Sequence, residues 1–239
     1  MIVEILPFGD SAALVKFEQR IDEKLSGSIF TLSSHLSRLD VIQFLTPAYC
    51  SILLGFDPEK ISFKDLKKLV VTGLDELDHG SEEIPRRHLR IPVCYDLSLG
   101  IDLAFVSSHT QLPTDEIIKT HKQKSYSVFM IGFLPGFSYL GVLPEILKCP
   151  RKETPREKVA KGSVGIAGAQ TGIYPADVPG GWQIIGRTPV PIFRPLADDP
   201  FLLRPGDQVS FFEVPMKQFE EITFQISQDN FDWTTLFYG

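Results

Sequence analysis

Hydrophobic positions in the first third of the chain follow two different periods. Short apolar runs over residues 2–6, 12–17, 41–45 and 49–56 predict four strands, because each run is bounded by turn-forming residues. Apolar residues recur at every third or fourth position over 21–39 and 62–77, which predicts two amphipathic helices. The order strand, strand, helix, strand, strand, helix predicts a small α/β unit whose two helices cover one face of a sheet.

A polar, acidic stretch over residues 75–83 interrupts this pattern and predicts an exposed linker. We therefore place a domain boundary near residue 84, with one domain over 1–84 and a second over 85–239. The second domain is expected to begin with a strand over 86–93 and two short helices over 102–108 and 114–124. Such a pair also suits a DNA-binding helix-turn-helix, but its acidic surroundings disfavour that alternative.

The remainder of the chain is rich in glycine and proline. Ten of the 18 glycines lie between Gly132 and Gly186, and 12 of the 18 prolines lie between Pro135 and Pro215. Helices are disfavoured where these residues are so dense, and many short strands with turns are typical of a closed or sandwich-like β domain. The expected strands cover residues 126–131, 163–167, 182–186, 191–193, 208–212 and 221–226, and the aromatic tail over 228–239 is left unassigned.

Charge and cysteine content exclude several classes of protein. A net charge of −6 disfavours a general nucleic-acid binder, since attraction to phosphate requires a basic surface. No apolar run reaches the roughly 20 residues of a membrane helix, and Glu4 and Asp10 argue against a signal peptide. Cys50, Cys94 and Cys149 are widely spaced, which predicts neither a disulfide framework nor a zinc cage. Reduced thiols indicate a cytoplasmic protein.

Four neighbouring segments carry the candidate chemistry. They cover residues 132–141, 148–161, 162–175 and 179–189. In the first, glycines would let backbone N–H groups approach a ligand closely while phenylalanines wall a pocket. A buried hairpin bend lined by core phenylalanines is the structural alternative for the same residues.

The second segment is strongly basic in an acidic chain. Its six basic residues stand against two acidic ones and give a local charge of +4: Lys148, Arg151, Lys152, Arg156, Lys158 and Lys161. Such a patch would receive a carboxylate or a phosphate, because arginine offers a planar pair of donors. Arg151 and Arg156 are the preferred candidates, since each adjoins a proline. For any single lysine, a solvated loop is the alternative.

The third and fourth segments add polar groups among small residues. The third matches neither a phosphate-binding P-loop nor a dinucleotide fingerprint, but its Gln170, Thr171 and Tyr174 are suited to hydrogen bonding with a small ligand. An irregular barrel strand with bulges is the alternative there. In the fourth, Trp182 offers a stacking surface and Arg187 would hold an anion, unless Arg187 forms a structural ion pair.

No catalytic triad or metal site is legible in the chain, and the catalytic residues are left unassigned. His109 and His121 lie near expected helix ends, where histidine is typically a surface or capping residue. Ser163 lies in the string GSVGIAG and not in the GxSxG string of a nucleophile elbow. Asp177 and the pair Asp198 and Asp199 lack the spacing of metal ligands. The residues therefore indicate a binding subunit, or half of a shared active site.

Long, ordered motifs nevertheless resemble one family. The strings are FMIGFLPGF at 129–137, PR at 150–151, TPR at 154–156, GSVGIA at 162–167, QTGIYP at 170–175, PGGW at 179–182 and IGRTP at 185–189. They resemble the family of 5-oxoprolinase B subunits, also called KipI or allophanate hydrolase subunit 1. The resemblance implies an α+β fold, with a small ferredoxin-like α/β N-terminal domain and a cyclophilin-like β-barrel C-terminal domain.

The resemblance also implies a function. Together with partner subunits A and C, members cleave 5-oxoproline to glutamate at the expense of ATP, so ATP is expected at the level of the complex and the isolated chain is expected to be inactive. The alternatives are an inhibitor of a sensor histidine kinase and an allophanate or urea-amide hydrolase subunit. Carried over by position, the expected site residues are Gly132, Phe133, Pro135, Gly136, Arg151, Arg156, Gln170, Thr171, Tyr174, Trp182, Arg187 and Thr188.

Overall fold

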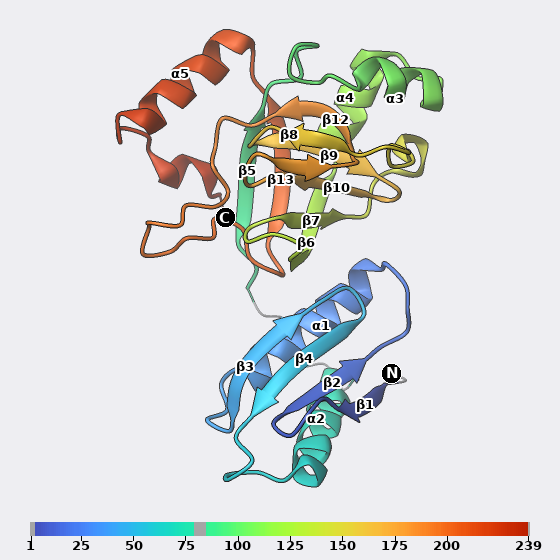
Figure 1. Ribbon diagram of the computed structural model, residues 1–239, viewed down its shortest axis with the longest axis vertical. Coiled ribbons are helices and arrows are strands. Elements are labelled where there is room, and N and C mark those ends of the chain that lie inside the picture. The colour runs from blue at the N-terminus through green and yellow to red at the C-terminus, as the bar shows by residue number, and fades with distance from the viewer. Residues whose placement is uncertain (1–2, 79–84, 239) are drawn as a thin grey trace. The chain divides into compact units, whose positions relative to one another are not determined.

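The computed structural model describes residues 3–78 and 85–238 (Figure 1). The chain divides into two compact units, Met1–Pro85 and Arg86–Gly239. Each unit has its own hydrophobic core, so each is described separately.

The N-terminal unit is a four-stranded antiparallel sheet with two helices. Its elements are β1 (Glu4–Pro7), β2 (Ala12–Lys16), α1 (Glu23–Leu36), β3 (Ile42–Pro47), β4 (Ser51–Phe56) and α2 (Phe63–Asp78). The strand order is β1-β2-β4-β3. This confirms the expected order of elements, although a ferredoxin-like chain runs strand, helix, strand, strand, helix, strand.

Both helices of this unit pack on the same face of the sheet. The Asp22 side chain accepts a hydrogen bond from the Leu25 N–H at 2.8 Å, which fixes the start of α1. From there α1 contributes Leu32, which is fully buried, and α2 contributes Leu66 and Val70 to one core with the strands. Because α2 continues to Asp78, residues 75–78 are helical, and the linker predicted for them is wrong. The rest of the predicted linker, 79–83, lies outside the described residues.

The C-terminal unit is a curled seven-stranded sheet. Its strand order is β12-β9-β10-β7-β6-β13-β5, and a separate ribbon pairs β11 with β8. The strands are β5 (His88–Val93), β6 (Ser125–Ile131), β7 (Ser138–Gly141), β8 (Arg156–Val159), β9 (Ser163–Ala167), β10 (Gln170–Ile173), β11 (Val178–Gly180), β12 (Gln183–Arg187) and β13 (Gln208–Glu213). The two edges of the sheet meet where Cys94 and Arg187 exchange backbone hydrogen bonds of 2.8 and 2.9 Å.

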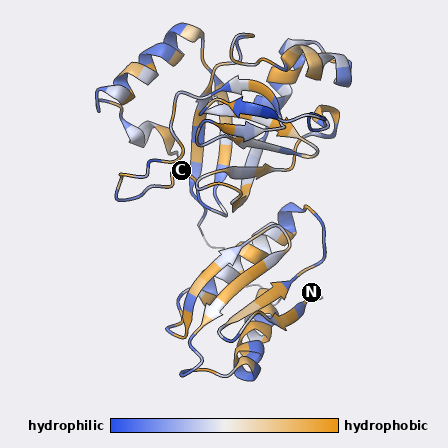
Figure 2. Cartoon of the chain, in the orientation of Figure 1, coloured by the Kyte–Doolittle hydropathy of each residue, from blue (hydrophilic) through white to orange (hydrophobic). Residues whose placement is uncertain are grey.

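Three helices flank this sheet (Figure 1). They are α3 (Leu103–Thr110), α4 (Thr114–Gln123) and α5 (Met216–Ser227), with short 3₁₀ turns at Glu145–Leu147 and Trp233–Leu236. Hydrophobic residues concentrate on the strands of the sheet, whereas β8 is hydrophilic (Figure 2). No helix of the described residues is long and apolar enough to cross a membrane.

Two of the predicted strands are wrong. Residues 221–226 lie in helix α5, because Ile222 is buried while Phe224 is 66% exposed, which fits a helical face and not an alternating strand. Residues 191–193 form no strand, although Phe193 bridges to Phe201. Strands β7, β8, β10 and β11 were not predicted from the sequence. They have three or four residues each, which is too short for an alternation of hydrophobic and polar residues to be visible.

Candidate active site

Aromatic residues from three of the four candidate segments meet in one cluster. Phe137 lies just before β7, Tyr139 lies in it, Tyr174 follows β10, and Trp182 precedes β12. The Phe137 ring centroid is 4.7 Å from that of Tyr139, 5.1 Å from that of Tyr174 and 5.4 Å from that of Trp182. We call these four side chains the aromatic cluster. Their edge-to-face contacts fix the orientation of each ring.

The second segment lies against this cluster through Arg151. Its guanidinium carbon lies 5.8 Å from the centroid of the Trp182 ring, within the range of a cation–π contact. Burial raises the pKa of Tyr139, and the positive charge of Arg151 opposes that rise. Among residues 3–78 and 85–238, no carboxylate forms an ion pair with Arg151. Arg151 therefore presents an uncompensated positive charge beside the aromatic cluster, of which Phe137, Tyr174 and Trp182 are buried.

A buried carboxylate anchors the other candidate arginine. Asp102, only 5% exposed, accepts a hydrogen bond from Arg156 Nη2 at 2.5 Å and one from the Ile184 N–H at 2.7 Å. Lys152 Nζ lies 3.9 Å from the same carboxylate. Asp102 thus joins the start of α3 to β12 and to the basic segment. Sequence reasoning missed this residue, because a lone aspartate before a helix has the pattern of a helix cap.

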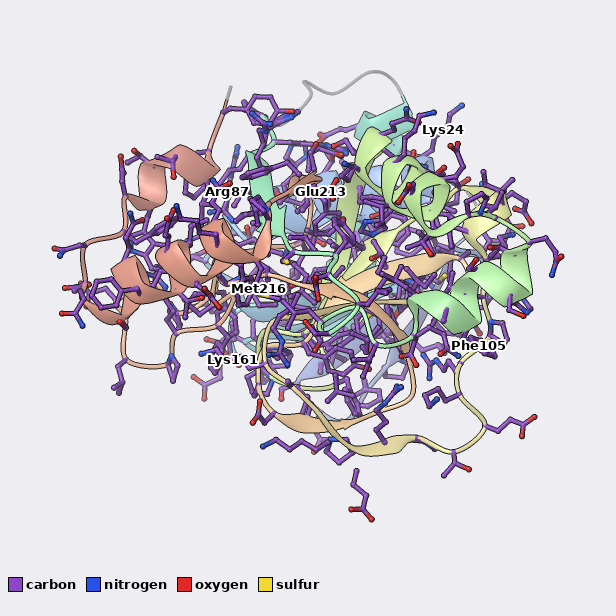
Figure 3. The ribbon with its side chains drawn as sticks, turned by 90° about the horizontal axis from the view of Figure 1, so that it is seen from above. Lys24, Arg87, Phe105, Lys161, Glu213 and Met216 are labelled. Carbon is purple, nitrogen blue, oxygen red and sulfur yellow. The ribbon has the colours of Figure 1, made fainter. Side chains whose placement is uncertain are left out.

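Most of the other basic residues of this segment are already paired. Lys148 Nζ lies 2.6 Å from Glu145, and Lys158 Nζ lies 2.7 Å from Asp177. Lys152 Nζ lies near Asp102. Lys161 (labelled in Figure 3) donates only its backbone N–H to Asp177, at 2.7 Å, and this contact does not involve its ammonium group. These acids lie outside the segment in which the charge of +4 was counted, so the patch is less positive than the sequence indicates.

Phe133 and the turn that carries it border the aromatic cluster. Gly132 donates its N–H to the Phe137 carbonyl at 3.1 Å and thereby closes the loop. Phe133 is 72% exposed, has a positive φ of 69°, and its ring lies 6.2 Å from that of Phe137. Gly136 has a φ of 84° and packs so closely on Phe193 that a side chain would not fit. Pro135 between them is exposed.

Arg187 and Thr188 are linked to Tyr174 of the aromatic cluster through the backbone of Gly162. The Thr188 N–H donates to the Gly162 carbonyl at 2.9 Å, and the Gly162 N–H donates to the Tyr174 carbonyl at 2.8 Å. Arg187 and Thr188 stand at the far end of β12 from Gln183, a separation of about 13 Å for a five-residue strand. Arg187 Nε is buried without a hydrogen-bond partner. Thr188 is buried, and its hydroxyl accepts a hydrogen bond from the Val190 N–H at 3.1 Å.

Thr171 lies in the core and is engaged by His121. The Thr171 hydroxyl donates to the Gly165 carbonyl at 3.1 Å and accepts from His121 Nε2 at 2.9 Å. His121 Nδ1 then accepts from the Tyr95 hydroxyl at 2.8 Å. Gln170, beside Thr171, is also buried. Both belong to the interior of the sheet, with little surface to offer a ligand.

The expected surface or capping position of His121 is wrong. Its side chain is fully buried, and burial lowers its pKa to about 3, so the ring is neutral at pH 7. His121 lies in the last turn of α4 but on the face that packs against the sheet, where its ring stacks 4.7 Å from that of Phe211. The position of His121 near a helix end in the sequence does not indicate whether its side chain faces solvent or the sheet.

The groups gathered around the aromatic cluster are suited to binding and orienting a ligand. Aromatic faces accommodate a small ring, and a guanidinium holds a carboxylate. Among the described residues, no group of three or more histidine, cysteine, aspartate or glutamate side chains is placed to hold a metal ion.

Sequence comparisons identify the family. The profile of the carboxyltransferase domain, subdomain C and D, matches residues 3–203. The chain is 51% identical to the B subunit of the 5-oxoprolinase of Haemophilus influenzae, over 87% of this chain and 97% of that protein. It is 38% identical to the B subunit of the Bacillus subtilis 5-oxoprolinase, over 90% of this chain and 95% of that protein. The chain belongs to the family of 5-oxoprolinase B subunits.

A solved structure shares the fold of this chain. The crystal structure of TTHA0988 matches with a TM-score of 0.73 and 34% identity, over 85% of this chain. The chain spans 40% of the length of TTHA0988. More distant similarity extends to the urea amidolyase of Saccharomyces cerevisiae, 27% identical over 90% of this chain and 13% of that protein.

This member of the B-subunit family also has a cavity that sequence reasoning missed. It measures about 500 Å³ and lies at the carboxyl ends of the parallel strands β5 and β13. Glu213 and Met216 (labelled in Figure 3) line it, together with Tyr95 and the start of α4. Such crevices are common binding places in sheets with parallel strands. The parallel pairing joins segments 120 residues apart, so no local pattern predicts it.

Proposed function

We propose that this chain is the B subunit of an ATP-dependent 5-oxoprolinase and acts with subunits A and C. The observation that carries the proposal is the 51% identity to the B subunit of a 5-oxoprolinase over 97% of its length. We further propose that the C-terminal unit is a cyclophilin-like barrel and that the protein acts in the cytoplasm. The sheet whose edges meet at Cys94 and Arg187 supports the barrel.

The need for ATP follows from the chemistry of the substrate. The lactam of 5-oxoproline is a stable amide. Transfer of the γ-phosphoryl group of ATP to the lactam oxygen releases ADP and leaves a carbon that water attacks. The ring C–N bond then breaks, the ring nitrogen takes up protons, and an acyl phosphate remains. A second water hydrolyses this acyl phosphate, which releases phosphate and gives the carboxylate of glutamate. We assign ATP to the complex as a whole.

Within this chain, we assign substrate binding to the aromatic cluster and Arg151. 5-Oxoproline is a compact five-membered ring with one carboxylate. The ring suits the edge of the cluster formed by the half-buried Tyr139 and the exposed Phe133, since Phe137, Tyr174 and Trp182 are buried. The carboxylate suits Arg151, which has a cation–π contact with Trp182 but no ion pair among the described residues. Phe133 at the rim is exposed and would cover a bound ring.

The role of Arg151 predicts a selective effect of its removal. Arg151→Gln should raise the KM of the complex for 5-oxoproline about tenfold, since a hydrogen bond to a charged group is lost. The KM for ATP should stay unchanged. Lys217→Gln, at a residue 88% exposed on α5, is the matched control. An Arg151→Gln complex with the KM of the wild type would contradict the assignment.

Capture of partners tests membership of the complex. The affinity-tagged full-length chain is recovered from native lysate of its own host, and bound proteins are identified by mass spectrometry. We expect a homologue of the 5-oxoprolinase C subunit in stoichiometric amount. Recovery of a histidine kinase in its place would support a kinase inhibitor and contradict the proposal.

A second function is favoured by the similarity to urea amidolyase. That similarity covers 90% of this chain, which makes an allophanate or urea-amide hydrolase subunit the alternative. The reconstituted complex is supplied with 5-oxoproline or allophanate, and ADP release is measured. Turnover of allophanate with none of 5-oxoproline would establish the alternative.

A further inference from the structure

Two polar side-chain atoms beside Asp102 are buried without a hydrogen-bond partner. One is a donor, Arg156 Nη1, and the other is an acceptor, Gln183 Oε1. Gln183 is only 2% exposed. A buried polar atom without a partner costs about 1–3 kcal/mol, so native proteins pair nearly all of them. Neither atom has a partner among the described residues, so a partner for either would come from outside the chain.

The surrounding contacts fix both side chains in place. Arg156 donates a hydrogen bond to Asp102 through Nη2, so its other terminal guanidinium nitrogen, Nη1, has no partner. Gln183 donates Nε2 to the Pro150 carbonyl at 3.0 Å, which directs its amide and leaves Oε1 unused. The next residue, Ile184, donates its N–H to Asp102, so the backbone that carries Gln183 adjoins the carboxylate that holds Arg156. In the β8–β11 ribbon, Arg156 lies opposite Gly180, close in sequence to Gln183.

The charges around Arg156 Nη1 and Gln183 Oε1 favour a neutral ligand group. The Asp102 carboxylate compensates Arg156, and Gln183 Oε1 repels a second anion. A bound carboxylate is therefore directed toward Arg151, which has no carboxylate partner among the described residues. A ligand that binds both Arg156 Nη1, a donor, and Gln183 Oε1, an acceptor, needs a hydrogen-bond acceptor and a hydrogen-bond donor side by side on one edge.

We propose that Arg156 Nη1 and Gln183 Oε1 bind the cis-amide edge of a lactam substrate. The guanidinium N–H donates to the ring carbonyl, and the ring N–H donates to Gln183 Oε1. The inference rests on the proposed function and deepens it, because it identifies the residues that distinguish a lactam from other small cyclic carboxylates. A site whose polar atoms are left unpaired by an analogue rejects that analogue strongly.

The test uses the lactone analogue, in which an oxygen replaces the ring N–H of 5-oxoproline. Equilibrium binding of the lactam and of the lactone to the assembled complex is measured by calorimetry with a non-hydrolysable ATP analogue present. For the wild type we expect the lactone to bind about tenfold to one hundredfold more weakly, since its ring oxygen opposes Gln183 Oε1. Equal binding of the two would overturn the inference.

Two variants test separately the contact to the lactam N–H and the contact to the lactam carbonyl. Gln183→Met should bring the affinities for lactam and lactone to within about threefold of each other, because the acceptor that discriminates between them is gone. Arg156→Lys should weaken both ligands about tenfold and preserve their ratio, because both keep the carbonyl. Gln225→Met and Arg204→Lys are exposed controls.

The outcomes distinguish this inference from the proposed function. If the wild-type complex hydrolyses 5-oxoproline and Gln183→Met still rejects the lactone as the wild type does, the inference fails and the function stands. If the wild-type complex neither binds nor hydrolyses 5-oxoproline, both fail. A purely structural role would lower the melting temperatures of the variants and leave the lactam-to-lactone ratio unchanged, which also overturns the inference.

Discussion

Asp102→Ala is expected to lower the free energy of unfolding of the protein by about 3–5 kcal/mol. The carboxylate is buried and satisfies both Arg156 Nη2 and the Ile184 N–H. Removing the carboxylate leaves the Arg156 guanidinium and the Ile184 N–H without their hydrogen-bond acceptor in the interior of the protein. Urea unfolding of the full chain, followed by circular dichroism, measures the loss.

A double-mutant cycle shows whether the loss comes from this ion pair. Removing Arg156 as well, as Arg156→Met, should recover part of the stability, because no uncompensated charge remains. Asp199→Ala is the matched control, since Asp199 pairs with Arg204 where both side chains are 54% exposed, and it should cost less than about 1 kcal/mol. Additive effects of the two substitutions would contradict the coupling.

The buried histidine is expected to make the C-terminal unit sensitive to acid. Burial lowers the pKa of His121 to about 3, whereas an unfolded histidine titrates near 6.5. Between these values the unfolded chain binds one more proton than the folded chain, so stability falls as the pH falls below 6.5. At about 1.4 kcal/mol for each pH unit, moving from pH 7 to pH 4.5 should cost roughly 2–3 kcal/mol through His121.

A comparison with His121→Met isolates this contribution from that of the carboxylates. Methionine fills the same interior place and does not titrate, although it forfeits the hydrogen bonds to Tyr95 and Thr171. The variant should therefore be less stable at pH 7 but lose less stability on acidification. If both proteins lose the same free energy of unfolding between pH 7 and pH 4.5, His121 is not the residue responsible.

Much of the fold could be predicted because its longest elements have clear periods. Helix α1 shows apolar residues at regular spacing, and strand β9 matches the predicted 163–167. Helix α5 could not be distinguished from a strand by its pattern. Ile222, Phe224 and Ile226 alternate as in a strand, while Phe219, Ile222 and Ile226 also follow a helical spacing. Only packing, which buries Ile222 and exposes Phe224, decides between the two.

The candidate site could be predicted in its parts but not in its connections. The segments that carry Arg151, Tyr174 and Trp182 could be recognised from composition, and the structure brings these residues together. The ion pair of Asp102 could not be recognised from the sequence, because its partner Arg156 lies 54 residues away. Arg187 was expected to hold an anion, and its place at the opposite end of β12 from Gln183 could not be read from the sequence.

The most direct test of the account is reconstitution of the complex from its purified components. Glutamate and ADP are measured with 5-oxoproline and ATP, first with all three subunits and then with each one omitted and restored. We predict that omitting this chain abolishes glutamate formation and that adding it back restores the full rate. Unchanged glutamate formation without this chain would contradict its assignment as a subunit of a 5-oxoprolinase.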